Sequence, residues 1–295
     1  MFVGILSQLS SQDLPWHFEA FRRYVVYRRM QQAASVLTLY EGETFDSSNP
    51  AMDELLGDLQ LRTGEDWLPK RKVSDSVEFN VEGDFYRNKG RLLTSFFIIE
   101  PKDFVESGLP LIRLTQFGQA LGNGFVSERQ YYEFIVKRIK YPHPAYEDNW
   151  QAWTQAGRTL RPLIFILQIL LELYESKPGC ANSYATSEEL ATFAYPQSSH
   201  EKIGVIADSI IQHRIKPSET REYSDEVNRK INDMLGFLCI AGFTFYDGKL
   251  VRLNLLGVHP QESAYYWEKR KTGEYEEAST LRDICNLIRD SGVGA

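Results

Sequence analysis

The stretch Tyr223–Leu253, YSDEVNRKINDMLGFLCIAGFTFYDGKLVRL, contains a helix pattern followed directly by a hairpin pattern. Apolar residues recur at the helical period in its first half, at Val227, Ile231, Met234, Leu235 and Leu238. A glycine ends this pattern, and the β-type runs 243–246 and 249–253 flank Asp247-Gly248, a dipeptide typical of tight hairpin turns. This order predicts the end of a winged helix-turn-helix unit, in which the helix enters a DNA groove and the hairpin lies beside it.

The composition bounds the function. The chain has 295 residues, of which 43% are hydrophobic and 25% charged, as in soluble globular proteins. Its 33 basic and 40 acidic residues give a net charge of -7, which argues against a protein held on DNA or a membrane by bulk charge alone. Specific DNA binding therefore requires local basic patches.

Location is indicated by cysteine usage and hydropathy. The three cysteines are widely spaced and form no CxxC pair, which predicts a reducing compartment and no structural zinc. Met1–Leu9 lacks the features of a signal peptide, and the longest apolar run, Leu163–Leu173, is too short to span a bilayer. We expect a cytoplasmic protein without a membrane partner.

A second stretch repeats the order of the first. Residues 84–96, DFYRNKGRLLTSF, have an apolar side and a polar side, which predicts a helix. The β-type runs 97–100 and 111–114 follow and are joined by a longer loop. This repeat predicts a second winged unit with a longer wing.

The remaining segments complete a mainly α fold with small β-hairpin wings. Helical patterns cover 13–40, 52–61, 116–121, 128–139, 162–174, 188–193, 201–214, 263–271 and 280–289, and a strand-like alternation covers 77–81. Thr186 or Ser187, with Glu189, resembles a capping box. We predict tandem winged helix-turn-helix subdomains: an N-terminal one over 1–145, a linker over 146–157 and a C-terminal one with closing helices over 158–295.

Candidate DNA-binding residues lie on the two helices and on the second hairpin. Arg and Lys suit guanine edges and phosphates, and Asn can pair with adenine through two hydrogen bonds. The candidates are Arg87, Asn88, Lys89, Arg91, Asn228, Arg229, Lys230, Asn232, Lys249 and Arg252. The alternative is that these side chains flank the wing or contact another subunit.

Catalytic motifs are absent from the sequence. It has no Walker A loop, no GxGxxG after a strand, no HExxH and no GxSxG, and its five histidines lack metal-ligand spacing. The nearest approach to a nuclease Glu-x-Lys is Glu268-Lys269-Arg270-Lys271, which has no acidic partner on a preceding strand. We therefore name no catalytic residue, metal ligand or cofactor, and leave open whether the chain is part of an enzyme.

Three stretches together carry a family resemblance. They are RLLTSFFIIEPKDFVESGLPLIRLTQFGQAL at 91–121, FIVKRIKYPHP at 134–144 with LRPLIFILQILLEL and YATSEELATFAYP, and RKINDMLGFLCIAGFTFYDGKLVRL at 229–253. Over residues 84–255 the chain resembles the recognition half of AlwI-type restriction endonucleases, which are type IIS enzymes related to the FokI kind. The first stretch is similar to that family's short helix, apolar strand, wing and L-T-x-x-G pattern.

The resemblance implies tandem winged helices that bind duplex DNA in a restriction or related anti-invader system. Enzymes of this family carry a separate metal-dependent nuclease domain, for which the sequence to Ala295 has neither room nor motif. We expect either a recognition fragment of a longer enzyme or a DNA-binding chain that partners with a separate nuclease. The alternatives are a winged-helix scaffold or dimerisation protein, a transcription regulator, or an enzyme with an unrecognised site.

Overall fold

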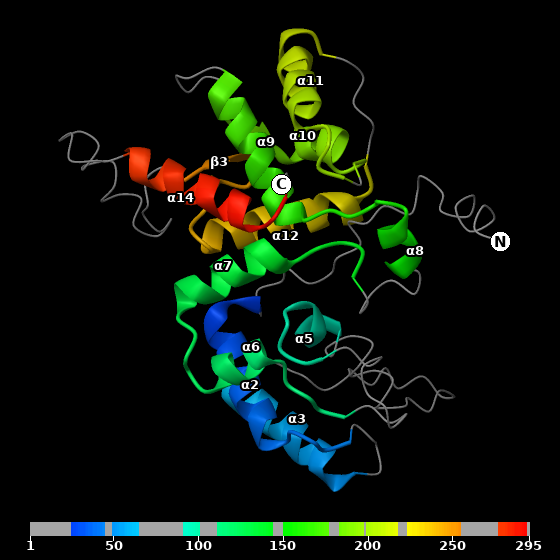
Figure 1. Cartoon of the computed structure of the whole chain (residues 1–295), viewed down its shortest axis with the longest axis vertical. Helices are drawn as coiled ribbons and strands as arrows, with labels where there is room; N and C mark the ends of the chain where they lie inside the picture. The colour runs from blue at the N-terminus through cyan, green and yellow to red at the C-terminus, as the bar shows by residue number, and fades with distance from the viewer. Residues whose placement is uncertain are drawn as a thin grey trace. The chain divides into compact units, whose positions relative to one another are not determined.

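The computed structural model describes residues 25–44, 49–64, 91–100, 111–143, 150–176, 183–197, 199–217, 223–254 and 277–293. These residues form two compact units (Figure 1). The N-terminal unit holds the described residues up to Tyr132 together with His143, and the C-terminal unit holds those of 133–142 and from Trp150 onward. The division falls inside helix α7 (Glu128–Arg138), and the segment expected to be a linker contains helix α8 (Trp150–Gln155). The domain limits near residues 145 and 158 stay a prediction.

Helix α2 (Tyr27–Leu39) is the centre of the N-terminal unit. It packs against α3 (Pro50–Thr63) and α6 (Gln116–Gly122). Helix α3 begins at Asn49, whose side chain accepts a hydrogen bond from the Ala51 N–H at 3.1 Å, with proline at its first position. The helices predicted over 52–61 and 116–121 are thereby confirmed.

Three extended segments of the N-terminal unit are hydrogen-bonded to one another. Ile99, which follows helix α5 (Arg91–Ser95), bridges antiparallel to Leu114, and Thr44, which follows α2, bridges antiparallel to Leu111. The segment 111–114 therefore lies between the other two. The β pairing predicted between 97–100 and 111–114 is confirmed as an isolated bridge, and the 42–44 segment was not expected.

The C-terminal unit is built around helix α9 (Pro162–Ser176). Nine of its side chains are buried, and α11 (Ile203–Ile215), α14 (Glu277–Asp290) and strand β3 (Leu250–Leu253) pack against it (Figure 1). Thr186 and Glu189 form the expected capping box, which opens α10 (Ser187–Glu189) and the π-helical turn η4 (Leu190–Ala194). Helix α12 (Asp225–Ile240) follows, with Ile231, Met234, Leu235 and Leu238 buried as its apolar stripe predicts.

A three-stranded antiparallel sheet completes the C-terminal unit. Strands β2 (Thr244–Tyr246) and β3 (Leu250–Leu253) form the predicted hairpin, and β1 (Ala185–Thr186) pairs with the other side of β3. The order β1-β3-β2 matches the pairing of the N-terminal unit. In both, the first and second extended segments flank the third. The fold is thus mainly helical with small β elements, as predicted.

Some expectations fall outside the described residues: the strand over 77–81, the helix over 263–271 and the first part of the helix over 13–40. Among the helices that are described, none is long and apolar enough to cross a membrane.

His200 forms hydrogen bonds with two residues, Arg161 just before α9 and Gln168 within it. Its Nε2 accepts a hydrogen bond from the Arg161 N–H at 2.9 Å, and its Nδ1 lies 2.7 Å from Gln168 Oε1, so the proton sits on Nδ1. Burial, with a smaller contribution from the charge of Arg161, lowers the pKa of His200 to about 4. Protonation of Nε2 would break the bond to Arg161.

We expect His200 to make the protein sensitive to acid. Because its folded pKa lies below the usual value near 6.5, its contribution to stability is present above that value and is lost as pH falls toward 4. The loss should be about 2 kcal/mol after allowance for solvent screening. Urea unfolding of wild type and His200→Gln at pH 7.5 and pH 4.5 checks this. The stability difference should shrink at the lower pH, and a constant difference would contradict the prediction.

Candidate nucleic-acid interface

Helix α12 presents one polar face to solvent. Its buried side chains pack toward the interior of the C-terminal unit, and Arg229 and Asn232 project from the opposite side, where both are exposed. Asn228 is half-buried. Ser224 occupies the position before the helix, but its side chain makes no capping hydrogen bond. The exposed face begins in the first turns of the helix, where Asp225 places a carboxylate beside the unpaired backbone N–H groups.

The turn between β2 and β3 is fixed by Asp247. Its Oδ1 accepts hydrogen bonds from the N–H groups of Lys249 at 2.9 Å and Leu250 at 2.8 Å, and these two bonds hold the carboxyl pKa below its usual value. Gly248 has φ +94°, which favours glycine. The turn leaves Lys249 exposed, and Arg252 is exposed on β3 opposite Phe245.

Helix α12 and the hairpin are joined through polar side chains. The Tyr246 hydroxyl on β2 donates to Asn232 Oδ1 at 2.7 Å and lies 3.4 Å from Ser187 Oγ at the start of α10. Asn232 therefore holds the hairpin against the helix. The amide oxygen of Asn232 accepts the hydrogen bond from Tyr246. Asn232 therefore positions the hairpin, and its amide N–H groups can still donate hydrogen bonds to a ligand.

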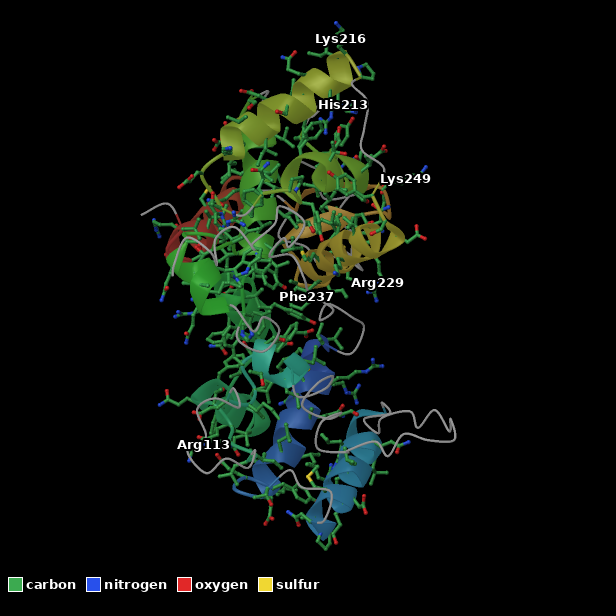
Figure 2. All side chains as sticks on the ribbon, turned by 90° about the vertical axis from the view of Figure 1, so that its right-hand side faces the viewer. Arg113, His213, Lys216, Arg229, Phe237 and Lys249 are labelled. Atoms are coloured by element: carbon green, nitrogen blue, oxygen red, sulfur yellow. The ribbon has the colours of Figure 1, made fainter. Side chains whose placement is uncertain are left out.

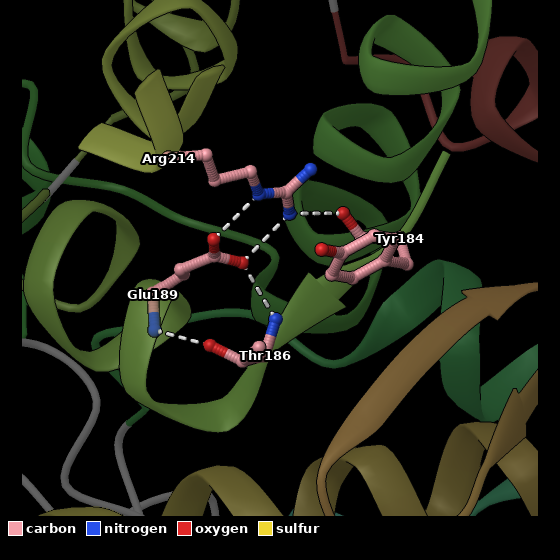
Figure 3. Close-up of polar contacts among 4 residues, drawn as sticks. All are labelled: Tyr184, Thr186, Glu189 and Arg214. Carbon is pink, nitrogen blue, oxygen red and sulfur yellow. Dashed lines mark hydrogen bonds and ion pairs between the residues drawn. The ribbon is translucent and has the colours of Figure 1, made fainter. Parts of the chain in front are cut away.

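A buried ion pair links the end of α11 to the chain segment that carries β1. Arg214, in the last turn of α11, donates to both carboxylate oxygens of Glu189, at 2.6 and 2.7 Å, and to the Tyr184 carbonyl at 2.6 Å (Figure 3). Its guanidinium also lies 4.0 Å from the centre of the Tyr184 ring. Glu189 Oε2 accepts from the N–H of Thr186 at 2.8 Å. One arginine thus fixes α11, the capping box and the residue before β1 together.

Basic side chains of this unit gather along one side. Figure 2 shows Arg229, Lys249 and Lys216 along the same edge of the C-terminal unit. Lys216 follows α11 and is exposed. Helix, hairpin turn and helix end therefore each place one cation along this edge, and cations spread along an edge can contact separate phosphates of a polyanion.

Comparisons with known proteins give one informative result. No protein-family model matches the sequence, and no curated protein matches it. Among solved structures, the chain is similar to the binding domain of the BpuJ1 endonuclease, from a crystal structure of its complex with pyrene- and phenanthrene-modified DNA. The TM-score is 0.52 at 14% sequence identity, over 80% of this chain and 77% of that one. Its fold resembles a restriction-endonuclease binding domain. The finer resemblance to the AlwI-type family stays a prediction.

The structure changes the set of candidate residues. Lys230 was predicted to face DNA, but it is buried at 4% exposure, because its position three residues after Val227 and four before Met234 places it on the apolar side of α12. We remove it from the set. Helical spacing alone could have identified this error.

The candidate residues of the N-terminal unit are described in part. Arg87, Asn88 and Lys89 lie outside the described residues. Arg91 begins α5, and its side chain is not described. Arg229, Lys249 and Arg252 remain as exposed candidates, and Lys216 joins them. The signal for Lys216 in the sequence was its place at the end of a predicted helix, shortly before the stretch that contains α12.

Proposed function

We propose that this chain binds double-stranded DNA as the recognition module or subunit of a restriction or related anti-invader system. Helix α12 would face a groove, and Lys249, Arg252 and Lys216 would contact phosphates. The observation that carries the proposal is one exposed face that joins a helix and a hairpin turn, braced by Asn232 and Tyr246. The similarity to an endonuclease binding domain solved with DNA supports it.

The repeated pairing order supports the finer proposal of tandem winged helix-turn-helix subdomains. In each unit a helix leads to a first extended segment, further helices follow, and two more segments close the sheet with the third in the middle. A strand order with the third segment in the middle is expected of a winged helix-turn-helix, in which the hairpin lies beside the helix. The N-terminal unit would contribute a second helix and wing, and a nuclease would be supplied by a separate chain or domain.

A binding experiment tests the proposal directly. Labelled random-sequence duplexes of about 30 base pairs, close to three turns of B-DNA, are titrated with the protein at several salt concentrations, and bound duplexes are selected and sequenced. We expect binding whose affinity falls steeply with salt, because phosphate contacts release counterions, and enrichment of one sequence or structure. Absence of binding at low salt would overturn the proposal in favour of a scaffold or dimerisation role.

Arg229→Ala should weaken duplex binding by about fivefold or more without unfolding the protein. Its guanidinium is exposed, so its removal costs little stability, while loss of a contact to a base edge or phosphate costs about 1 to 3 kcal/mol of binding free energy. Fluorescence anisotropy measures the affinity. Arg289→Ala is the matched control. This arginine is also exposed, but it lies on α14, outside the α12 face, and its charge is next to Asp290 at 3.5 Å. Equal affinities for the two variants would remove α12 from the interface.

A further inference from the structure

Five basic residues meet where α7 ends and α9 begins. Lys137 and Arg138 lie in the last turn of α7, Lys140 follows it, and Arg158 and Arg161 precede α9. We call these five residues the junction cluster. All belong to the C-terminal unit, and none is part of α12 or the hairpin.

Backbone pairing holds the two segments of the cluster together. Tyr141 and Leu160 form an antiparallel bridge, with N–H to carbonyl distances of 2.7 and 2.9 Å, in the stretches that connect α7, α8 and α9 (Figure 1). Arg161 also donates from Nη1 to the carbonyl of Lys137. The pairing therefore brings the segment that carries Lys137, Arg138 and Lys140 next to the segment that carries Arg158 and Arg161.

Among the residues that the structure describes, no carboxylate forms an ion pair within 4.0 Å of these five side chains. Some arginines outside the cluster have acidic partners: Arg214 lies 2.6 Å from Glu189, and Arg289 lies 3.5 Å from Asp290. The C-terminus of α7 offers only about half an elementary charge, which cannot balance five cations. Arg161 itself is used to satisfy a carbonyl at that helix end.

Two arginines of the cluster are held against aromatic rings. The guanidinium of Arg138 lies 6.0 Å from the centre of the Phe134 ring, and that of Arg158 lies 5.4 Å from the Trp153 ring. Such packing restrains the side chain but leaves its N–H donors available to an oxygen ligand. Arg138 and Lys140 are exposed.

Burial, and to a smaller extent neighbouring positive charge, lowers the pKa of two groups at the cluster. The pKa of Arg161 is lowered, first by burial and then by the charge of Arg138. His200, whose pKa is lowered by burial and then by Arg161, stays neutral beside the cluster. A bound anion would relieve this repulsion.

We propose that the junction cluster is a second, sequence-independent contact site for the phosphodiester backbone of DNA. It rests on the proposed function and adds a site to it. Arg138, Lys140 and Arg158 supply the donors, and Arg161 fixes the geometry. A polyanion fits better than a single anion, because the cations are spread over two chain segments and successive phosphates of one strand present spaced charges.

The test compares two variants of equal charge. The cluster variant carries Arg138→Gln, Lys140→Gln and Arg158→Gln, and the control carries Arg62→Gln, Arg129→Gln and Arg289→Gln, which are exposed and lie outside the cluster and the α12 face. Arg161 is left intact because it satisfies the end of α7. Affinity for a random-sequence duplex of about 30 base pairs is measured against salt concentration.

We expect the slope of log affinity against log salt to fall by about 0.9 for each phosphate that the protein no longer neutralises, so by roughly 2 to 3 in the cluster variant, with little change in the control. Acetylation of Lys140 in the wild-type chain should slow when the duplex saturates it, and this measurement needs no variant. Equal slopes for the two variants, or an unchanged acetylation rate, would overturn the inference while the proposed function stands. A change in oligomeric state in place of a change in slope would also overturn it, in favour of an acidic protein surface.

The two proposals fail differently. A wild-type chain that does not bind the duplex at low salt overturns the proposed function, and the junction cluster loses its ligand with it. A wild-type chain that binds, and whose affinity the cluster substitutions leave unchanged, overturns only the junction cluster.

Discussion

Gly118→Ala should destabilise the N-terminal unit by about 3 kcal/mol or more. A Cβ atom at this position would lie 2.0 Å from the carbonyl oxygen of Ile98 and 2.9 Å from its carbonyl carbon. Both are backbone atoms, so the contact cannot be relieved by a side-chain rotation. Helix α6 would have to move away from the 98–100 segment, which would stretch the 3.0 Å hydrogen bond from the Thr115 N–H to the same carbonyl.

The neighbouring residue explains why a larger side chain is excluded here. Thr115 accepts a hydrogen bond from the Gly118 N–H at 2.9 Å and donates to the carbonyl of Phe97, so it pins the start of α6 to the extended segment. The L-T-x-x-G letters at 114–118 therefore have a physical basis in this protein: the threonine makes the connection, and the glycine permits the close approach.

Gly57→Ala is the matched control for this prediction. Gly57 lies in α3 of the same unit, and apart from its chain neighbours and the nearby backbone of its own helix no atom is within 4 Å of the Cβ that alanine would add. Alanine is the better helix former, so this variant should gain about 0.5 to 1 kcal/mol. Urea unfolding followed by circular dichroism measures both. A Gly118→Ala protein as stable as wild type would mean that α6 approaches Ile98 less closely than described.

Arg214→Met should cost the C-terminal unit about 3 to 5 kcal/mol, because it leaves the Glu189 carboxylate buried without its cation. The Glu189 side chain is 9% exposed and the Arg214 side chain 14% exposed, so water has little access to replace the missing partner. The Tyr184 carbonyl, which accepts from Arg214 at 2.6 Å, loses a donor at the same time. Urea unfolding is the measurement.

A double-mutant cycle separates the ion pair from the capping box. Glu189→Gln removes the charge but keeps an oxygen for the Thr186 N–H, because glutamine serves at this capping position. If Arg214 and Glu189 stabilise the fold through their mutual interaction, the double variant Arg214→Met with Glu189→Gln should lose less free energy of unfolding than the sum of the two single variants. We expect the difference to be about 1 kcal/mol or more. Additive costs would show that the two residues act separately.

Much of the fold could be predicted from the sequence because the helices carry regular apolar stripes. Helices α3, α7, α9, α11 and α12 and the β2–β3 hairpin follow their patterns closely. Strand β1 could not be predicted, because two residues carry no periodicity and Ala185 pairs with a strand residue, Val251, that is distant in sequence.

The candidate site was less predictable than the fold. Charge and residue type selected Arg229, Lys249 and Arg252, which are exposed, but also Lys230, which is buried. The tie between Asn232 and Tyr246 depends on how the hairpin folds against the helix, which sequence spacing does not give. The junction cluster depends on a β-bridge between segments that the sequence separates by a helix.

The pairing of β1 with β3 has a consequence for folding. A hairpin of two short strands is marginally stable in water, and β1 is the third strand that supports it. Ala185 and Val251 are far apart in the sequence, and closing so long a loop is slow and costs chain entropy. The surface that carries Lys249 should accordingly be among the last parts of the C-terminal unit to fold, and among the first to open in local fluctuations.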